Sequence, residues 1–430
     1  MGTETASETR DLYRSDNVVV RQVAAGDRDR WVVTFDNYGI GHGFSRPGFG
    51  ESWLRSQKIS AIHVMGRAED WYQYEDLDAA LAIVRATLEG ASRVITYGSS
   101  MGGYAAVRFA DAVGAHAALA LSPQYTLDPE VAAHDRRWSQ DANRIAWIKA
   151  LNGPLEVKAR VILAFDPWGL DGWHGRRIVE EAAPNCIRLP YTAHPVTTFL
   201  SEIGLLGDLV LRALHDVLDV DAFEREARSR KAQSGVYLGE MASLQPEHRR
   251  GLALALARRA VEASPANHHA RLNLARLLLR NGAHDEALAL FEGLVADSGR
   301  ALTYLVDHGQ ALAVAGRPGE ARAIAAEVIG QADNVAHLHG WAAHMCWLNG
   351  DTADARTHIL RAVELDPSNS AYMKAAVDYH LGRRAAGATS SVRQTPLLSF
   401  ARWLGRRAFV RNAAKALMRR TPAQAATAAP

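Results

Sequence analysis

The chain has 430 residues, too many for one ordinary hydrophobic core, so two domains of roughly 200 residues each are expected. Its composition, 48% hydrophobic, 22% charged and 7% aromatic, is that of a folded protein and excludes a disordered or fibrous chain. The net charge is +2, but residues 388–430 hold eight Lys and Arg and no acid; the remaining 41 basic and 47 acidic residues give no reason to expect a nucleic-acid partner.

Residues 17–223 alternate short β-rich runs with longer helical stretches, a pattern that predicts an α/β fold with a mostly parallel sheet and helices on both faces. Residues 1–16 are polar and are expected to be disordered. The predicted strands are Val18–Ala24, Trp31–Phe35, Ile59–Val64, Arg93–Tyr97, Ala117–Leu121, Val161–Phe165 and Cys186–Leu189. The predicted helices are Glu75–Leu88, Met101–Ala112, Gly175–Ala183 and Val196–Ile203. The turn-rich GDRD between the first two strands predicts an antiparallel hairpin at the sheet edge.

The segment RVITYGSSMGGYAAV carries the motif with the clearest chemistry. It places Gly98-Ser99-Ser100-Met101-Gly102, a G-x-S-x-G motif, between a β-branched strand and a helix. A nucleophilic serine on so sharp a turn needs nearly side-chain-free neighbours two positions away on each side, and the helix that follows directs its N-terminal dipole at a developing oxyanion. Gly98 and Gly102 meet the first requirement, so Ser100 is predicted to be a nucleophile.

With this motif in this setting, residues 17–220 resemble the α/β-hydrolase superfamily. In that superfamily the catalytic residues follow the chain order Ser, acid, His, with the acid after a late strand and the His after the last one. The resemblance implies Ser100, Asp166 at the end of the strand VILAF, and His194 after the strand CIRLP. These residues follow the carboxyl ends of predicted strands, where open α/β sheets place their sites.

Each residue type has a chemical reason to be there. A free serine hydroxyl is a poor nucleophile near neutral pH, so Ser100 needs His194 as a base that takes its proton and later returns it to the leaving group. Asp166 would fix the imidazole tautomer and stabilise the imidazolium. Two alternatives stay open. Asp171, five residues on in WGLDGWHG, could be the acid, and His174 could be the base.

Two N–H groups are expected to stabilise the oxyanion. The resemblance implies that the N–H of Met101 supplies the first. The second is expected from the loop after the Trp31–Phe35 strand, from Tyr38 rather than Asn37, although the family's usual His-Gly dipeptide is replaced here by DNYG. This loop is glycine-rich but completes neither G-x-G-x-x-G nor a P-loop, so no nucleotide cofactor is expected.

Aromatic and arginine side chains are expected around the mouth of this site. They come from the segment after the Ile59–Val64 strand and from SPQYTLDPEVAAHDRRWSQD, which is long enough to form a cap. The residues concerned are Trp71, Tyr72, Arg136, Arg137 and Trp138. Such a mixture suits a polar or sugar-bearing acyl substrate better than a lipid tail, and ordinary solvated loop residues are the alternative.

The C-terminal half, residues 233–387, predicts helix after helix with an internal repeat. A glycine recurs every 34 residues and an alanine follows five positions later, at Gly282, Gly316 and Gly350 with Ala287, Ala321 and Ala355. Pro265 and Pro367 lie three such periods apart. The pattern resembles the tetratricopeptide repeat, whose small residues let paired helices pack closely and whose prolines close each unit. The resemblance implies a module that binds a protein partner.

Three further segments complete the expected organisation. The charged stretch 224–232 is expected to link the two domains. Residues 388–420 form a basic amphipathic segment, and residues 421–430 a low-complexity tail expected to be disordered. The amphipathic helix is expected to cap the repeat stack, and contact with an anionic membrane surface through residues 396–420 is the alternative.

The remaining signals bear on compartment and cofactors. Cys186 and Cys346 fall in different predicted domains, so neither a disulfide framework nor a zinc knuckle is expected. No apolar run approaches the roughly 18 residues that span a bilayer, and Ala6 stands where a myristoylation signal needs Ser or Thr. We expect a cytoplasmic protein without cofactor or metal, because the histidines at 337, 339 and 344 lack the spacing and carboxylate support of zinc hydrolases.

Three functions remain open from the sequence. The first is a serine hydrolase that forms a covalent acyl-enzyme from a small acyl or ester substrate, with the repeats binding a protein partner. The second is a hydrolase-fold scaffold or adaptor with weak or no catalysis. The third is an acyltransferase that uses the same three residues.

Overall fold

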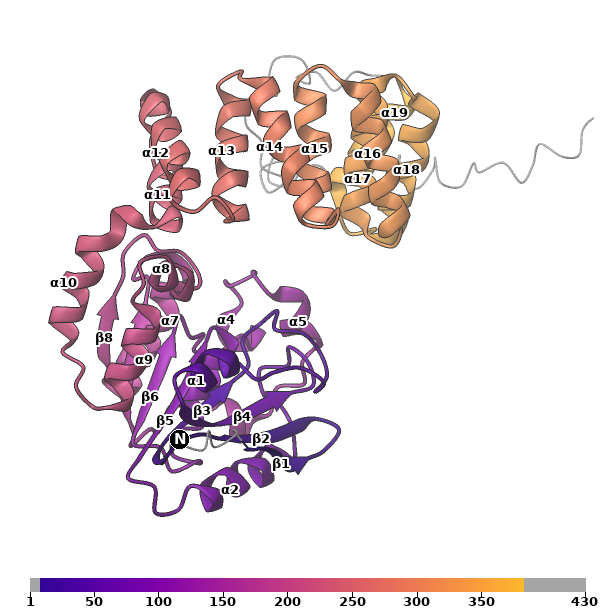
Figure 1. Ribbon diagram of the computed structural model, residues 1–430. Helices are drawn as coiled ribbons and strands as arrows, with labels where there is room; N and C mark the ends of the chain where they lie inside the picture. The colour runs from indigo at the N-terminus through magenta and orange to yellow at the C-terminus, as the bar shows by residue number, and fades with distance from the viewer. Residues whose placement is uncertain (1–7, 383–430) are drawn as a thin grey trace, which may run out of the picture. The chain divides into compact units, whose positions relative to one another are not determined.

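The computed structural model describes residues 8–382 of the chain. These residues divide into two compact units, residues 8–244 with 262–264 and residues 245–261 with 265–382 (Figure 1). The basic segment 388–420, its expected contacts through residues 396–420 and the tail 421–430 lie outside the described residues. Within residues 8–382, no helix is both long enough and apolar enough to cross a bilayer.

The first unit is built on one eight-stranded sheet with the strand order β1-β2-β4-β3-β5-β6-β7-β8 (Figure 1). The strands are β1 (Glu8–Arg14), β2 (Val18–Ala24), β3 (Asp27–Phe35), β4 (Ile59–Gly66), β5 (Arg93–Ser99), β6 (Ala117–Leu121), β7 (Arg160–Phe165) and β8 (Asn185–Arg188). β1 pairs antiparallel with β2 and β2 antiparallel with β4, whereas every pair from β4 to β8 is parallel. The predicted strands are all present, in a mixed sheet that is mostly parallel.

The hairpin predicted from GDRD does not form, because β2 and β3 are not neighbours in the sheet. β4 lies between them and pairs with both, antiparallel to β2 and parallel to β3. The short connection therefore passes the N-terminal end of β4, where Val23 pairs with Ala61 and Asp27 with Ile59. The disorder predicted for residues 1–16 is corrected for residues 8–14, which form the edge strand β1. The strand ETRDLYR is polar because its position at the sheet edge leaves much of it exposed.

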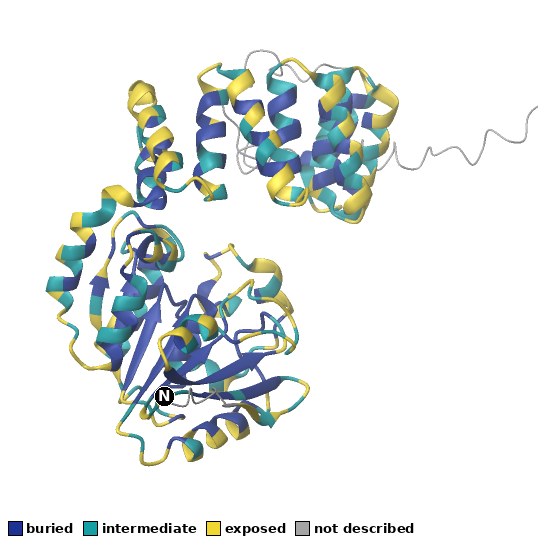
Figure 2. Cartoon of the chain, viewed as in Figure 1, coloured by how far each residue is buried: buried dark blue, intermediate teal, exposed yellow. Residues whose placement is uncertain are grey.

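Helices cover both faces of the sheet, and neighbouring residues of one strand enter different cores. Val33 of β3 packs in the core that contains α2 and α3, and the adjacent Val32 packs in the core that contains α1, α8, α9 and α10. The helices of this unit are α1 (Glu51–Ser56), α2 (Leu77–Thr87), α3 (Met101–Arg108), α4 (Pro129–Ala132), α5 (Ser139–Arg144), α6 (Lys149–Asn152), α7 (Gly169–Ala182), α8 (Val196–Glu202), α9 (Leu206–Leu214), α10 (Val220–Arg230) and α11 (Gly235–Ser243). Figure 2 shows β2, β4, β5, β6 and β7 buried almost throughout, as two-sided covering requires.

The charged stretch predicted to be a linker, residues 224–232, is instead mostly helix α10. Asp219 caps the helix by accepting a hydrogen bond from the N–H of Ala222. Phe223 and Ala227 lie four residues apart on one face of the helix and are fully buried in the sheet core. Most side chains of the helix are charged, so two apolar residues were too few to predict a buried helix from the sequence. The next helix, α11, also belongs to the first unit, so the helical repeats begin later than residue 233.

The second unit is a row of paired helices with a strict period. Its helices are α12 (Arg250–Ala263), α13 (His268–Arg280), α14 (His284–Asp297), α15 (Leu302–Val314), α16 (Pro318–Gln331), α17 (Ala336–Asn349), α18 (Thr352–Leu365) and α19 (Ser370–His380), preceded by a 3₁₀ turn at Glu247–Arg249. Helices α13, α15, α17 and α19 begin 34 residues apart, as do α14, α16 and α18. The predicted period is therefore the period of the structure.

The repeated small residues hold the same place in every pair. The glycines at 282, 316 and 350 have φ values of 79°, 79° and 87°, the left-handed conformation that ends a helix and that glycine adopts without strain. The alanines at 287, 321 and 355 are completely buried, where a larger side chain would separate the paired helices.

Candidate active site

Ser100 lies on a sharp turn between β5 and α3. Its backbone is in a rarely occupied conformation, with φ 54° and ψ −117°. Glycine is required on both sides: a Cβ on Gly98 would stand 2.1 Å from the carbonyl oxygen of Gly102, and a Cβ on Gly102 would stand 2.4 Å from the carbonyl oxygen of Phe35. The strain and the steric limits are those expected for a nucleophilic serine on the turn between a strand and a helix.

The Ser100 hydroxyl is in hydrogen-bond contact with His194, as predicted from the chain order. The Oγ of Ser100 lies 2.9 Å from Nε2 of His194, and Nδ1 of the same ring lies 2.7 Å from Oδ2 of Asp171. The three side chains come from the turn after β5, the loop after β8 and the first turn of α7. We call Ser100, His194 and Asp171 the candidate triad.

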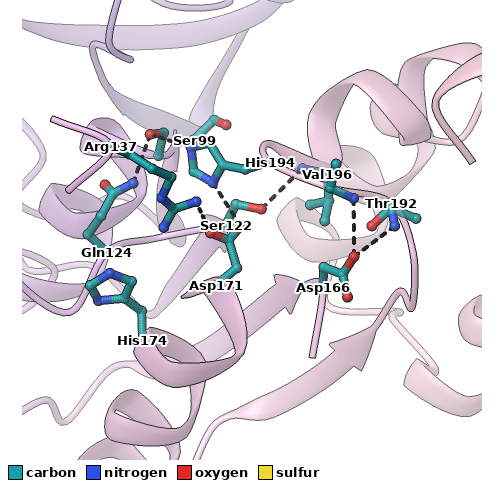
Figure 3. A network of polar contacts seen from close by, with 12 residues as sticks. Ser99, Ser122, Gln124, Arg137, Asp166, Asp171, His174, Thr192, His194 and Val196 are labelled. Carbon is teal, nitrogen blue, oxygen red and sulfur yellow. Dashed lines mark hydrogen bonds and ion pairs between the residues drawn. The ribbon is translucent and has the colours of Figure 1, made fainter. Parts of the chain in front are cut away.

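Asp166, the acid preferred from sequence, does not contact His194, and this expectation is corrected in favour of Asp171. Its Oδ2 accepts the N–H groups of Thr192 and Ala193 at 2.9 and 3.1 Å, and its Oδ1 accepts the N–H of Trp168 at 3.0 Å. Figure 3 shows Asp166 beside Thr192, apart from the pair that Asp171 and His194 form. Asp166 therefore holds the loop that leads to His194.

The pKa shifts of Asp171 and Asp166 also favour Asp171 as the acid. Burial alone would raise the pKa of Asp171, but the hydrogen bond and charge of His194, together with the charge of Arg137, bring its pKa below the ordinary value. Burial raises the pKa of Asp166, against the lowering effect of its backbone hydrogen bonds. An acid that stabilises an imidazolium has to be ionised, and Asp171 is the better suited of the two.

His174, the alternative base, is fully buried and is occupied elsewhere. Its Nδ1 accepts the N–H of Tyr125 at 3.1 Å, and its Nε2 lies 3.0 Å from Oδ2 of Asp135. Burial lowers its pKa, which favours the neutral ring that these two contacts require. His174 therefore anchors the segment between β6 and β7.

That segment, residues 122–144, supplies contacts that sequence analysis missed. The Nε2 of Gln124 donates to the Oγ of Ser100 at 3.0 Å, and the ring of Trp138 packs edge-on against His194 with centroids 5.1 Å apart. Gln124 is itself held by Trp71, whose Nε1 donates to its Oε1 at 3.3 Å. No local signal could identify Gln124, because its role depends on a contact 24 residues away in the chain.

The expected mouth residues are placed differently from the prediction. Trp71 and Tyr72 are completely buried, so they pack in the core and do not line an open mouth. Arg137 forms ion pairs with Asp171 and Asp135, whereas the neighbouring Arg136 is exposed. Trp138, which is partly exposed, keeps the expected place beside the site.

The loop after β3 approaches the turn that holds Ser100. Its first residue, Asp36, is buried and takes both terminal nitrogens of Arg46, with Oδ1–Nη1 and Oδ2–Nη2 distances of 3.1 and 2.7 Å. The ring of Tyr38 packs against Trp138, and its hydroxyl donates to Asp141. Met101 is the first residue of α3, so its N–H has no acceptor within the helix. The assignment of the N–H groups of Met101 and Tyr38 to an oxyanion site stays a prediction.

Replacing Gly102 with alanine is expected to destabilise the first unit by about 3 kcal/mol or more, because the new Cβ would overlap the main chain at the end of β3. The melting temperature of that unit should fall by roughly 6 °C or more. Gly26→Ala is the matched control, since a Cβ there meets nothing within 4 Å and the backbone conformation suits alanine. Equal melting temperatures for the two variants, measured by circular dichroism, would contradict the proposed close approach.

Among residues 8–382, no three His, Cys, Asp or Glu side chains are grouped so that they could hold a metal ion. The two cysteines are both free.

Comparisons with known proteins identify the second unit. Two family models described as tetratricopeptide repeat match residues 247–301 and 306–370. Similar solved structures include YrrB, "a TPR protein with an unusual peptide-binding site", at 15% identity and a TM-score of 0.31, covering 45% of this chain and 97% of YrrB. TTC0263 of Thermus thermophilus has 21% identity and a TM-score of 0.29, covering 40% of this chain and 98% of its own. Pseudomonas aeruginosa pilF has 15% identity and a TM-score of 0.32, covering 48% and 97%.

The TM-scores of these structures are too low for them to say more about this chain than the two family models do. No curated protein matches the chain. Residues 247–370 thus carry tetratricopeptide repeats, as predicted within the broader range 233–387.

Proposed function

We propose that this chain, which carries tetratricopeptide repeats over residues 247–370, is a serine hydrolase of the α/β-hydrolase type acting on acyl esters. The single observation that carries the proposal is the continuous contact from the Ser100 hydroxyl through both ring nitrogens of His194 to Asp171, at 2.9 and 2.7 Å. The chain order Ser, Asp, His and the strained turn at Ser100 are further support.

The geometry suits covalent catalysis by acyl transfer. His194 would take the Ser100 proton on Nε2 as the oxygen attacks the carbonyl carbon, while Asp171 on Nδ1 keeps the ring in the right tautomer and stabilises the imidazolium. The same proton would then pass to the leaving alcohol, giving an acyl-enzyme. Water activated by His194 would attack that ester and release the acid and the free Ser100 hydroxyl.

Stabilisation of the oxyanion would come from main-chain N–H groups. Met101 at the start of α3 offers one donor, reinforced by the helix dipole. Tyr38 on the loop after β3 is the proposed second donor, and the Asp36–Arg46 ion pair would keep that loop in place. The buried amide of Gln124 lies close enough to Ser100 to help orient the hydroxyl.

The repeats suggest that the chain also binds a protein partner, an interaction or adaptor role common to such modules. This leaves a second candidate function, in which the first unit is a scaffold with weak or no catalysis. The observation in its favour is that the family matches fall on the repeats.

A screen of activated acyl esters with the purified full-length chain separates the two candidates. Turnover of at least one ester above the uncatalysed rate is expected for the hydrolase, with release of the carboxylic acid measured directly. A folded protein that turns over none of the esters and resists a fluorophosphonate probe would favour the scaffold.

A further inference from the structure

One segment touches all three members of the candidate triad. Within residues 122–144, Gln124 donates to Ser100, Trp138 packs on the His194 ring, and Arg137 binds Asp171. Figure 3 shows the side chains of Arg137 and His194 both directed at Asp171. Each oxygen of the Asp171 carboxylate therefore has its own partner, Oδ1 with the guanidinium and Oδ2 with the imidazole.

The Arg137 guanidinium is fixed from three directions. Its Nη1 lies 2.6 Å from Oδ1 of Asp171, and its Nη2 lies 2.8 Å from Oδ2 of Asp135. Its central carbon stands 4.6 Å from the centroid of the Trp138 ring, a cation–π contact. The hydrogen bond from His174 in turn holds Asp135, whose side chain is completely buried. The side chain of Arg137, which is 27% exposed, is thus held by the buried carboxylate of Asp135.

We propose that Arg137 is a positioning residue that acts on His194 through Asp171 and sets the pH range in which Ser100 can be activated. The inference rests on the proposed hydrolase function. By occupying Oδ1, Arg137 turns Oδ2 toward the imidazole, and its positive charge offsets part of the negative charge that would otherwise stabilise the imidazolium. An imidazolium cannot accept the Ser100 proton. Because Arg137 makes the imidazolium form less stable, the neutral ring that acts as the base stays available at lower pH.

The charged and titratable groups around Asp171 and His194 come from several elements. The groups are Arg137 and Asp135 from the segment after β6, Asp171 and His174 from α7, and Asp166 from the loop after β7. Of these, Arg137 is the positive charge in direct contact with the acid of the candidate triad. Without the positive charge of Arg137, the negative charges of the carboxylates would stabilise the imidazolium form of His194 more strongly.

The test measures the rate of fluorophosphonate labelling against pH, from about 5 to about 9, in full-length wild type, R137M, R137K and R136M. We expect the acid limb of the R137M profile to move to higher pH by roughly one unit, the size of one partly screened charge. The plateau rate should fall about tenfold or more as Asp171 loses its orientation. R137K keeps the positive charge but lacks the planar guanidinium that contacts Asp171 and Asp135 together. Its plateau rate should therefore fall, while the acid limb of its pH profile should move little.

R136M is the matched control, because Arg136 is exposed and adjacent, and its profile should superimpose on that of the wild type. An R137M profile with an unmoved acid limb would overturn the proposal even if the plateau fell, since packing alone would explain that loss. R137Q removes the same charge and takes the place of R137M if the latter fails to fold. An unlabelled wild type would refute the hydrolase itself, whereas a labelled wild type with an unmoved limb in R137M refutes the role of Arg137 alone.

Discussion

Replacing Ser100 with alanine is expected to reduce hydrolysis of an activated acyl ester on the order of 10⁶-fold. The substitution removes the oxygen placed 2.9 Å from Nε2 of His194, so neither attack on the carbonyl nor an acyl-enzyme remains. The turn itself should stay intact, because the glycines on both sides set its shape. Steady-state rates and melting curves of the same preparations would separate loss of chemistry from loss of fold.

The neighbouring serine provides the control for this experiment. Ser99 is as buried as Ser100, but its hydroxyl faces Thr197 at 3.4 Å and does not contact His194. Ser99→Ala should therefore retain most of the wild-type rate. If S100A keeps more than a small fraction of the activity, the hydrolysis comes from another site.

The second large effect is expected at Asp171. Asp171→Asn should reduce the ester turnover rate about 10⁴-fold, because an amide cannot stabilise the imidazolium or hold the required tautomer. Little stability should be lost, because the amide has the same shape as the carboxylate. Rates should be compared at the pH optimum of each protein. A D171N variant with near-wild-type turnover would remove Asp171 from the candidate triad.

Asp166→Asn is expected to behave in the opposite way. Its carboxylate accepts backbone N–H groups from Trp168, Thr192 and Ala193 at 3.0, 2.9 and 3.1 Å, and an amide can leave one of them without an acceptor. The cost is roughly 1–3 kcal/mol, or a melting temperature lower by roughly 2–12 °C. The rate should fall by about 10²-fold at most, through displacement of the His194 loop. The reverse order of effects in the two variants would restore Asp166 as the acid.

The turn at Ser100 could be predicted from the sequence because its requirements are local. Two glycines at fixed spacing, a strand before and a helix after specify the backbone, and the close contacts of Gly98 and Gly102 give the steric reason. His194 could be predicted from its place after the last strand. The 34-residue period could be predicted equally well, because each helix pair repeats the same packing with the same small residues.

The choice between the two acids could not be made from sequence. The sequence places Asp166 and Asp171 five residues apart after the same strand, and which of them faces His194 depends on where α7 begins. Helix α7 starts at Gly169, so Asp171 is in its first turn and points to the imidazole, while Asp166 remains with the backbone of the neighbouring loop. Pairings of this kind are set by tertiary structure.

Strand neighbours and surface helices could not be predicted for the same reason. The short turn between β2 and β3 is typical of a hairpin, yet β4 pairs with both strands and separates them. The charged α10 has the sequence pattern of a linker because its buried residues are few, Phe223 and Ala227. The contacts of Gln124 and Arg137 with the candidate triad join residues far apart in the chain and have no local signature.

The most direct measurement is the mass of the full-length protein after reaction with a fluorophosphonate probe, followed by mapping of the modified peptide. One adduct per chain is expected, on Ser100, and none on S100A under the same conditions. A folded wild-type protein that gains no adduct, or gains it on a residue other than Ser100, would contradict the claim that this serine is an activated nucleophile.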